Sequence, residues 1–297
     1  MTAGATAAAP SLWTMLRRSP YVRHRGLMTG IALTVLFVLV ALLGPLLAPH
    51  DPLATNLRNA LAPPGTDYLL GTDRFGRDVF SRLLFGARAS LLVALSVGAI
   101  SLTCGVIIGT AAGFAGGWPD RILLGLINIL LAFPGFLLAL TFVAIRGSSL
   151  GNVIAAVAIA YTPRVAIVMR AVVMTIRPRQ FIEASYAIGV PTLRIVWKHV
   201  LPNSLPPVIV VATVSAAFAV LAEAGLSFLG LGVQPPAPTW GNVITEGRPF
   251  LVSHPWISLS AGASIAAAVT GLNLLGDGVR DTLDPFLRNQ TSTNIFK

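Results

Sequence analysis

Residues 89–115 read ASLLVALSVGAISLTCGVIIGTAAGFA and contain no charged side chain. A helix needs about 20 mainly apolar residues to cross roughly 30 Å of hydrocarbon. Hydrocarbon offers no partners to backbone amides and carbonyls, so a crossing segment must satisfy them within its own helix. The stretch is therefore predicted to be a transmembrane helix.

Five further stretches meet the same requirement, and together the six predict an all-α polytopic membrane protein with six transmembrane helices. The five are residues 27–48, 122–145, 150–171, 203–227 and 256–276. The fourth crossing includes Arg164 and the fifth includes Glu223. Pro134 and Pro206-Pro207 lack amide donors and are expected to kink or delay the third and fifth helices.

The composition also indicates a membrane protein. Of the 297 residues, 55% are hydrophobic and 11% are charged, whereas ordinary soluble proteins carry roughly 25% charged residues. The net charge of +10 indicates membrane orientation and contact with acidic headgroups, since nucleic-acid binding would need basic side chains gathered on one soluble face. The single cysteine, Cys104, lies in an apolar run, which excludes an intrachain disulfide and a cysteine metal cluster.

Lysine and arginine predict the orientation in the membrane. If the N-terminus is cytoplasmic, 14 of the 21 lie on inner segments, as the positive-inside rule favours. Residues 1–26 and 280–297 are then cytoplasmic, and residues 49–86 form an external loop. The first crossing is interpreted as a retained anchor, because no A-x-A cleavage site follows it.

Small residues recur every four positions in the second crossing, at Ser101, Gly105, Gly109 and Gly113. This spacing places them along one helix face and permits close approach of a neighbouring backbone. Helix packing is favoured over a role in a pore.

The connecting segment 172–202 is the most informative loop, and from Arg177 it reads RPRQFIEASYAIGVPTLRIVWKHVLP. Its apolar spacing predicts a short amphipathic helix that ends at Gly189. Pro191 prevents simple continuation, and residues 193–200 are expected to start a second helix that leads to the membrane. On physical grounds the segment is either a protruding contact for a cytoplasmic partner or a solvated connection.

A resemblance to a known family applies to this segment. The run Glu183-Ala184-Ser185, Gly189 and Leu201-Pro202 resembles the E-A-A-x3-G-x9-I-x-L-P signature of permease subunits in bacterial ABC importers. Two positions depart from the signature. Ser185 replaces its second alanine. His199 replaces its isoleucine, and this histidine provides either a hydrogen bond, a pH-sensitive contact or interfacial packing.

Three more stretches narrow the resemblance to the C-type permeases of dipeptide, oligopeptide and nickel importers. They are LGTDRFGRDVFSRLLFGAR at 70–88, AGLSFLGLG at 224–232 and GDGVRDTLDP at 276–285. The resemblance implies a type I ABC importer permease fold, with a core over residues 87–279, in the bacterial inner membrane. It implies import of short peptides, with nickel or another small solute as the alternative.

The resemblance also implies partners and roles. These are a homologous B-type permease, one or two ABC ATPase subunits that use ATP and Mg, and an extracytoplasmic solute-binding protein. The residues assigned to ATPase coupling are Glu183, Ala184, Ser185, Gly189, His199, Leu201, Pro202 and Arg280. No cofactor or metal is expected on this chain, and it is not predicted to be an enzyme: its only lysines, Lys198 and Lys297, lack a phosphate-binding loop.

Four charged residues cluster before the second crossing: Asp73, Arg77, Asp78 and Arg82. Asp73 with Arg77, and Asp78 with Arg82, have helical spacing, so ion pairs that brace the external loop are favoured over a hydrolytic or metal site. The external loops are also a natural surface for the delivery protein.

Glu223 is the one carboxylate well inside a predicted crossing. Such residues generally face a partner or a cavity. We therefore consider two roles, a gate or substrate-amine contact and an inter-helix hydrogen bond, of which the second is favoured. A secondary ion-coupled carrier is the main rival function, and an intramembrane enzyme is a third, although the spans contain no spaced His/Asp/Glu set.

Overall fold

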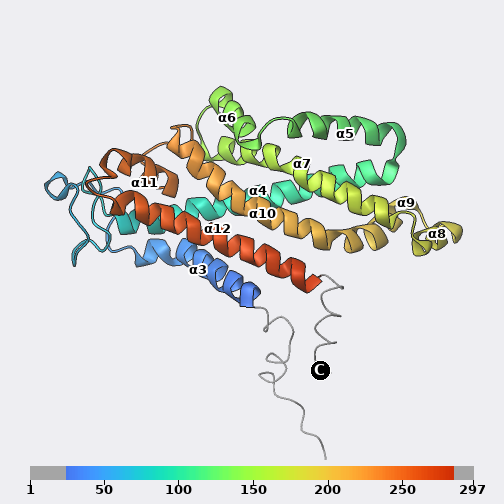
Figure 1. Cartoon of the computed structure of the whole chain (residues 1–297), viewed down its shortest axis with the longest axis horizontal. Helices are drawn as coiled ribbons and strands as arrows, with labels where there is room; N and C mark the ends of the chain where they lie inside the picture. The colour runs from blue at the N-terminus through green and yellow to red at the C-terminus, as the bar shows by residue number, and fades with distance from the viewer. Residues whose placement is uncertain (1–24, 284–297) are drawn as a thin grey trace, which may run out of the picture.

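The computed structural model describes residues 25–283, and its regular elements there are all helical (Figure 1). The predicted terminal segments lie outside these residues up to position 24 and from position 284 onward. In chain order the elements are α3 (Arg25–Leu47), η1 (Leu57–Asn59), α4 (Val79–Ala115), α5 (Gly117–Leu131), α6 (Gly135–Arg146), α7 (Leu150–Ile176), α8 (Gln180–Ala187), α9 (Thr192–Ile195), η2 (Val196–Val200), α10 (Leu201–Phe228), α11 (Trp240–Gly247), η3 (Arg248–Phe250) and α12 (Trp256–Leu283).

Long helices run side by side along the molecule (Figure 1). Within the described residues, five helical segments are long and apolar enough to cross a membrane, and α5 with α6 make a sixth if that bent pair is one span. The prediction of an all-helical polytopic protein is confirmed.

The third predicted crossing, residues 122–145, is not a straight helix. α5 ends at Leu131, α6 begins at Gly135, and the two are bent by 85°. Pro134 causes the break, because it has no amide donor and lies in an extended conformation (φ −56°, ψ 123°) just before α6. The predicted kink is confirmed, but it is sharp enough to divide the segment into two helices.

The fifth crossing behaves differently. α10 continues through Pro206 and Pro207, and the expected delay is wrong, because helical structure begins at Thr192 and passes through the wide turn η2. In η2 the Leu201 N–H donates to the carbonyl of Val196, five residues back. Pro202 follows and cannot donate an N–H, so the wider turn lets the chain enter α10 without a break.

Helices α4 and α7 approach each other closely. A Cβ added at Gly105 would lie 2.6 Å from the Cβ of Val165, and one added at Gly109 would lie 2.6 Å from the Cβ of Met169. Both contacts are on α7, and Ser101 on the same face of α4 is fully buried. The packing role predicted for the small residues is confirmed.

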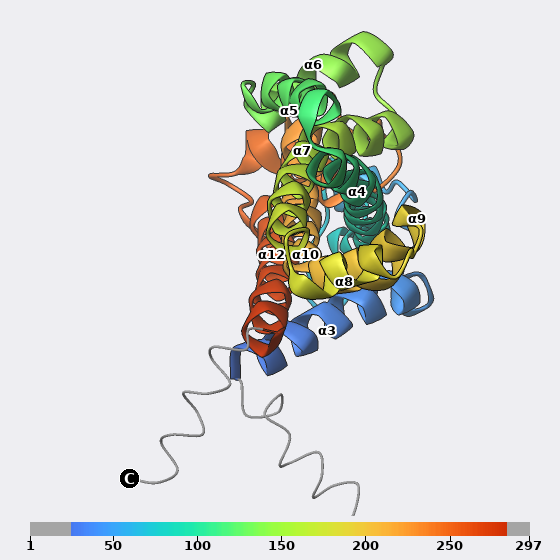
Figure 2. The same cartoon turned by 90° about the vertical axis from the view of Figure 1, so that its right-hand side faces the viewer.

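The two ends of the bundle carry different elements. The segment between α3 and α4 lies at one end together with α11, and α8 and α9 lie at the other (Figure 1). Figure 2, viewed from the second end, shows α8 lying across the ends of the long helices. The predicted external loop, residues 49–86, and the segment 172–202 therefore lie at opposite ends of the bundle.

Candidate functional site

Helices α8 and α9 with η2 form a projection, residues 180–200, which we call the α8–α9 elbow. α8 ends at Ala187, and Gly189 follows two residues later with a positive φ of 77° that favours glycine. The Gly189 N–H donates to the carbonyl of Tyr186 (2.9 Å), and the Val190 N–H donates to that of Ser185 (3.0 Å). These two bonds make a Schellman stop, so the predicted helix end is confirmed.

One face of the elbow is anchored in the bundle. Ile182 and Ile195 are fully buried and belong to a core cluster with Val173 of α7 and Val208 of α10. Ser185 is also buried, and its hydroxyl donates to the carbonyl of Phe181 (2.7 Å). Serine at this signature position is thus satisfied within its own helix.

The opposite face of the elbow is exposed and apolar. Ile188 is 80% exposed, Leu193 70% and Trp197 68%. Exposed apolar patches of this kind mark sites of contact with another protein or with a membrane. Among the residues assigned to coupling, Glu183, Ala184, Gly189 and Pro202 are exposed, whereas His199 and Leu201 are half-buried.

Arg280, also assigned to coupling, is exposed near the end of α12. Figure 1 shows α12 ending apart from α8. The structure therefore brings seven of the eight assigned residues together on or beside the elbow and leaves Arg280 separate.

A groove of about 420 Å³ lies beside the elbow. It is lined by Gly113, Gly116, Asp120, Met174, Arg177, Pro178 and Glu183. Asp120 at the start of α5 binds Arg170 of α7 through two oxygens (Oδ1–Nε 2.5 Å, Oδ2–Nη2 2.7 Å). Sequence reasoning missed this pair, although an acid at the edge of a charge-free stretch was a usable signal. The pair ties the α4–α5 turn to the helix that leads into the elbow.

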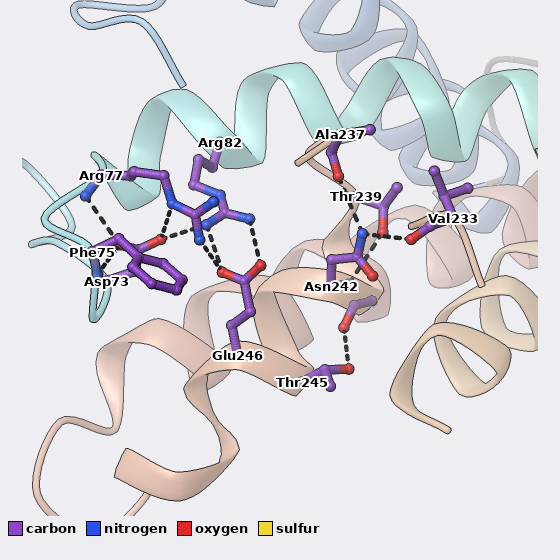
Figure 3. Close-up of polar contacts among 11 residues, drawn as sticks. Asp73, Phe75, Arg77, Arg82, Val233, Ala237, Thr239, Asn242, Thr245 and Glu246 are labelled. Carbon is purple, nitrogen blue, oxygen red and sulfur yellow. Dashed lines mark hydrogen bonds and ion pairs between the residues drawn. The ribbon is translucent and has the colours of Figure 1, made fainter. Parts of the chain in front are cut away.

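At the other end of the bundle, four charged side chains form a buried ion cluster: Asp73, Arg77, Arg82 and Glu246 (Figure 3). Arg77 Nε lies 2.6 Å from Asp73 Oδ2, and Arg82 Nη1 lies 2.6 Å from Glu246 Oε2. Arg77 also pairs with Glu246, and Arg82 with Asp73. The two carboxylates balance the charge of the two guanidinium groups, and each carboxylate pairs with both arginines.

The predicted Asp73–Arg77 pair is confirmed, but the predicted Asp78–Arg82 pair is wrong. Asp78 is the N-cap of α4, where its carboxylate accepts the Ser81 N–H (3.0 Å) and hydroxyl (2.6 Å). The first amides of a helix lack intrahelical acceptors, so a capping carboxylate has a nearer partner than the arginine one turn on. Arg82 instead reaches Glu246, which sequence reasoning missed because it lies far along the chain.

Helix α11, which carries Glu246, is fixed in place by further polar contacts (Figure 3). Asn242 Nδ2 donates to the carbonyls of Val233 (2.8 Å) and Ala237 (3.1 Å), and Thr239 caps the helix by accepting the Asn242 N–H. Buried Trp240 donates its Nε1–H to the carbonyl of Leu83 in α4 (2.9 Å). Polar contacts therefore connect the α3–α4 segment, α4 and α11 at this end of the bundle.

A second groove of about 650 Å³ runs along the bundle and carries no charged side chain in its lining. It is lined by Phe136, Tyr161, Phe218, Leu221, Ala222, Ala224, Gly225, Phe228, Ile244, Gly262, Ile265, Ala266 and Val269. These residues come from α6, α7, α10, α11 and α12. Five helices therefore contribute to one open, apolar groove.

Glu223 does not line this groove. At 100° per residue its side chain points to the face of α10 opposite the lining residues, and it is 1% exposed. Its carboxylate accepts a hydrogen bond from the Ser227 hydroxyl (2.8 Å), one turn further along the same helix. This geometry places Glu223 inside the packing and away from the groove, which argues against the gate or substrate-amine role; the bond to Ser227 lies within α10 and is not the inter-helix bond that was favoured.

Comparison with known proteins identifies the family. Residues 105–289 match the family described as binding-protein-dependent transport system inner membrane component, and residues 11–64 match the N-terminal TM domain of oligopeptide transport permease C. A dipeptide transport system permease protein DppC from Alkalihalophilus pseudofirmus is 42% identical over 260 residues, covering 88% of this chain and 86% of that protein.

Two other curated relatives cover still more of the chain. A putative peptide transport system permease protein of Brucella abortus is 40% identical and covers 95% of this chain and 98% of its own length. The oligopeptide transport system permease protein OppC of Bacillus subtilis is 35% identical, with coverage of 94% and 91%.

Among solved structures, an inward-facing conformation of the MetNI methionine ABC transporter superposes with a TM-score of 0.54. It is 18% identical and covers 68% of this chain and 96% of the other. At that identity the likeness concerns the fold. The matched family and the relatives together establish that the chain belongs to the family of inner membrane components of binding-protein-dependent transport systems.

Proposed function

We propose that this chain is the C-type permease subunit of an ATP-driven importer of short peptides in the bacterial inner membrane. It forms half of the translocation path with a homologous B-type permease. One or two ABC ATPase subunits supply the energy with ATP and Mg, and an extracytoplasmic binding protein delivers the peptide. Both termini are cytoplasmic. The names of the relatives support the peptide substrate.

The α8–α9 elbow is the observation that carries this proposal. Its exposed apolar side chains suit a groove on another protein, and its buried isoleucines tie it to the bundle. α8 follows α7 directly, and α9 runs through η2 into α10. A push on the elbow is therefore delivered to two helices that line the apolar groove, which is how a motor outside the membrane can change access to a path within it.

The test uses a surface substitution at Ile188, whose side chain is 80% exposed. Ile188→Asp should abolish co-purification of the ATPase subunits and ATP-driven peptide uptake into proteoliposomes, because a charge enters an apolar contact. Val252→Asp is the matched control, since Val252 is fully exposed in the segment between α11 and α12 at the other end. It should keep the ATPase bound.

If both variants retain the ATPase subunits equally, the elbow does not have the proposed coupling role. Uptake that persists without ATP but collapses with an ion gradient would identify a secondary carrier instead. Uptake of nickel in place of peptides would retain the transporter class and change the substrate.

A further inference from the structure

Arg164 is a charged residue within a membrane-spanning helix that the proposed coupling mechanism does not use. At 1.5 Å per residue, about 21 Å of α7 separates it from Leu150 and about 18 Å from Ile176. Its side chain is exposed on the surface of this subunit. Because a charge at this depth is costly in hydrocarbon, intramembrane arginines generally face a cavity or a partner and mark the path of a solute.

The guanidinium has an aromatic contact but no counter-ion within residues 25–283. It lies over the ring of Tyr161, with Cζ 5.4 Å from the ring centroid. The other arginine in the body of α7, Arg170, is neutralised by Asp120. Arg164 has no ion pair in the described part of the chain, so its N–H donors are available to an anion.

The direction of the side chain argues against a lipid phosphate as that anion. Tyr161 lies one turn before Arg164, so the guanidinium reaches toward the start of α7. The inner membrane surface, in the orientation proposed above, lies at the other end of this helix. An arginine that extended its charge to the nearer headgroups would point toward Ile176.

Tyr161 also places the charge beside the apolar groove. Its ring stacks on Phe218 of α10 (centroids 6.3 Å apart, planes 11° apart), and both residues line the groove. Arg164 thus stands at the margin of a groove whose lining side chains are apolar or aromatic. A single cation there can fix one anionic group while the apolar wall accepts variable side chains.

We propose that Arg164, held by Tyr161, binds the carboxylate of a peptide as it passes through the groove. The C-terminal carboxylate suits this role, because every linear peptide with a free C-terminus carries it. Guanidinium binds carboxylate through two parallel N–H bonds, which gives both charge and geometry. This inference rests on the proposed peptide-import function and adds a residue of this chain that reads the substrate.

The experiment compares one peptide with a free C-terminus and the same peptide as its C-terminal amide, in the assembled transporter with its binding protein. Concentration dependence of uptake is measured for wild type, Arg164→Gln and Arg164→Lys. The ratio of acid to amide uptake in each variant is divided by the wild-type ratio. Any preference of the binding protein for one of the two peptides is the same for wild type and variants, so it cancels in this normalised ratio.

Arg164→Gln should lower this ratio by on the order of tenfold, the loss expected for one charge-assisted hydrogen-bonded pair. Arg164→Lys keeps the charge without the paired donors and should fall in between. Arg121→Gln is the matched control, because Arg121 is also an exposed arginine over an aromatic ring (Trp118, 6.0 Å). Its ratio should equal that of wild type.

Three results would overturn the assignment. An equal fall for acid and amide together with loss of the second permease from the complex would mean that Arg164 pairs with a carboxylate of that partner. An equal fall that depends on anionic lipid would mean a headgroup contact. An unchanged ratio with normal uptake would mean no role. Failure of the wild type to import any peptide would instead refute the proposed function.

Discussion

Gly109 offers a direct test of how closely the helices of this bundle must pack. In Gly109→Ala the new Cβ would lie 2.6 Å from the Cβ of Met169 and 3.0 Å from the backbone nitrogen of Arg170, and closer still to the carbonyl oxygen of Ala166. Ala166 and Met169 are fully buried. Ordinary contact begins at 3.4 Å, so α4 and α7 must separate by roughly 1 Å.

The expected cost follows from two opposing terms. Overpacking against atoms that cannot move costs about 1–3 kcal/mol, and backbone contacts place this site at the upper end. Alanine gains about 1 kcal/mol over glycine inside a helix. The net loss for Gly109→Ala is therefore about 2 kcal/mol in the free energy of unfolding.

The assay is thermal unfolding of the purified transporter in detergent, with peptide uptake measured in parallel. Gly125→Ala in α5 is the matched control, because nothing lies within 4 Å of its added Cβ. It should leave the melting temperature unchanged or raise it, whereas Gly109→Ala should lower it by several degrees. If both variants melt together, the close approach of α4 and α7 does not contribute as argued.

Three further predictions concern the elbow and the opposite end of the bundle. Glu246→Gln leaves one uncompensated positive charge in the buried cluster with Arg77 and Arg82. Thermal unfolding should therefore show a loss of about 3–5 kcal/mol in the free energy of unfolding. An unchanged melting temperature would mean that the cluster is solvated. Gly189→Leu strains a backbone at φ 77° by about 1–2 kcal/mol; peptide uptake per ATP hydrolysed should fall, and an unchanged ratio would contradict the coupling role of the elbow. Trp240→Phe removes the donor to the carbonyl of Leu83 and should cost about 1–3 kcal/mol in thermal unfolding; wild-type stability would show that this carbonyl finds another partner.

The helical elements were largely predictable from the sequence, because each depends on neighbours within a few turns. The apolar stretches, the break at Pro134 and the stop at Gly189 follow from backbone hydrogen bonding that is local to the chain. The face shared by Gly105 and Gly109 also follows from helical spacing. It predicts that a helix approaches there, but not that the helix is α7.

Tertiary structure alone decided which distant residues meet. Spacing favoured Asp78 as the partner of Arg82, yet the fold supplies Glu246 from α11 and leaves Asp78 to cap α4. Hydropathy located Glu223 inside a crossing but could not orient it, since the direction in which α10 faces depends on every helix packed against it. For the same reason the apolar groove and the place of Arg164 beside it emerge only when the helices are assembled. Local backbone chemistry sets where helices begin and end, whereas the pairing of their side chains is a property of the whole packed bundle.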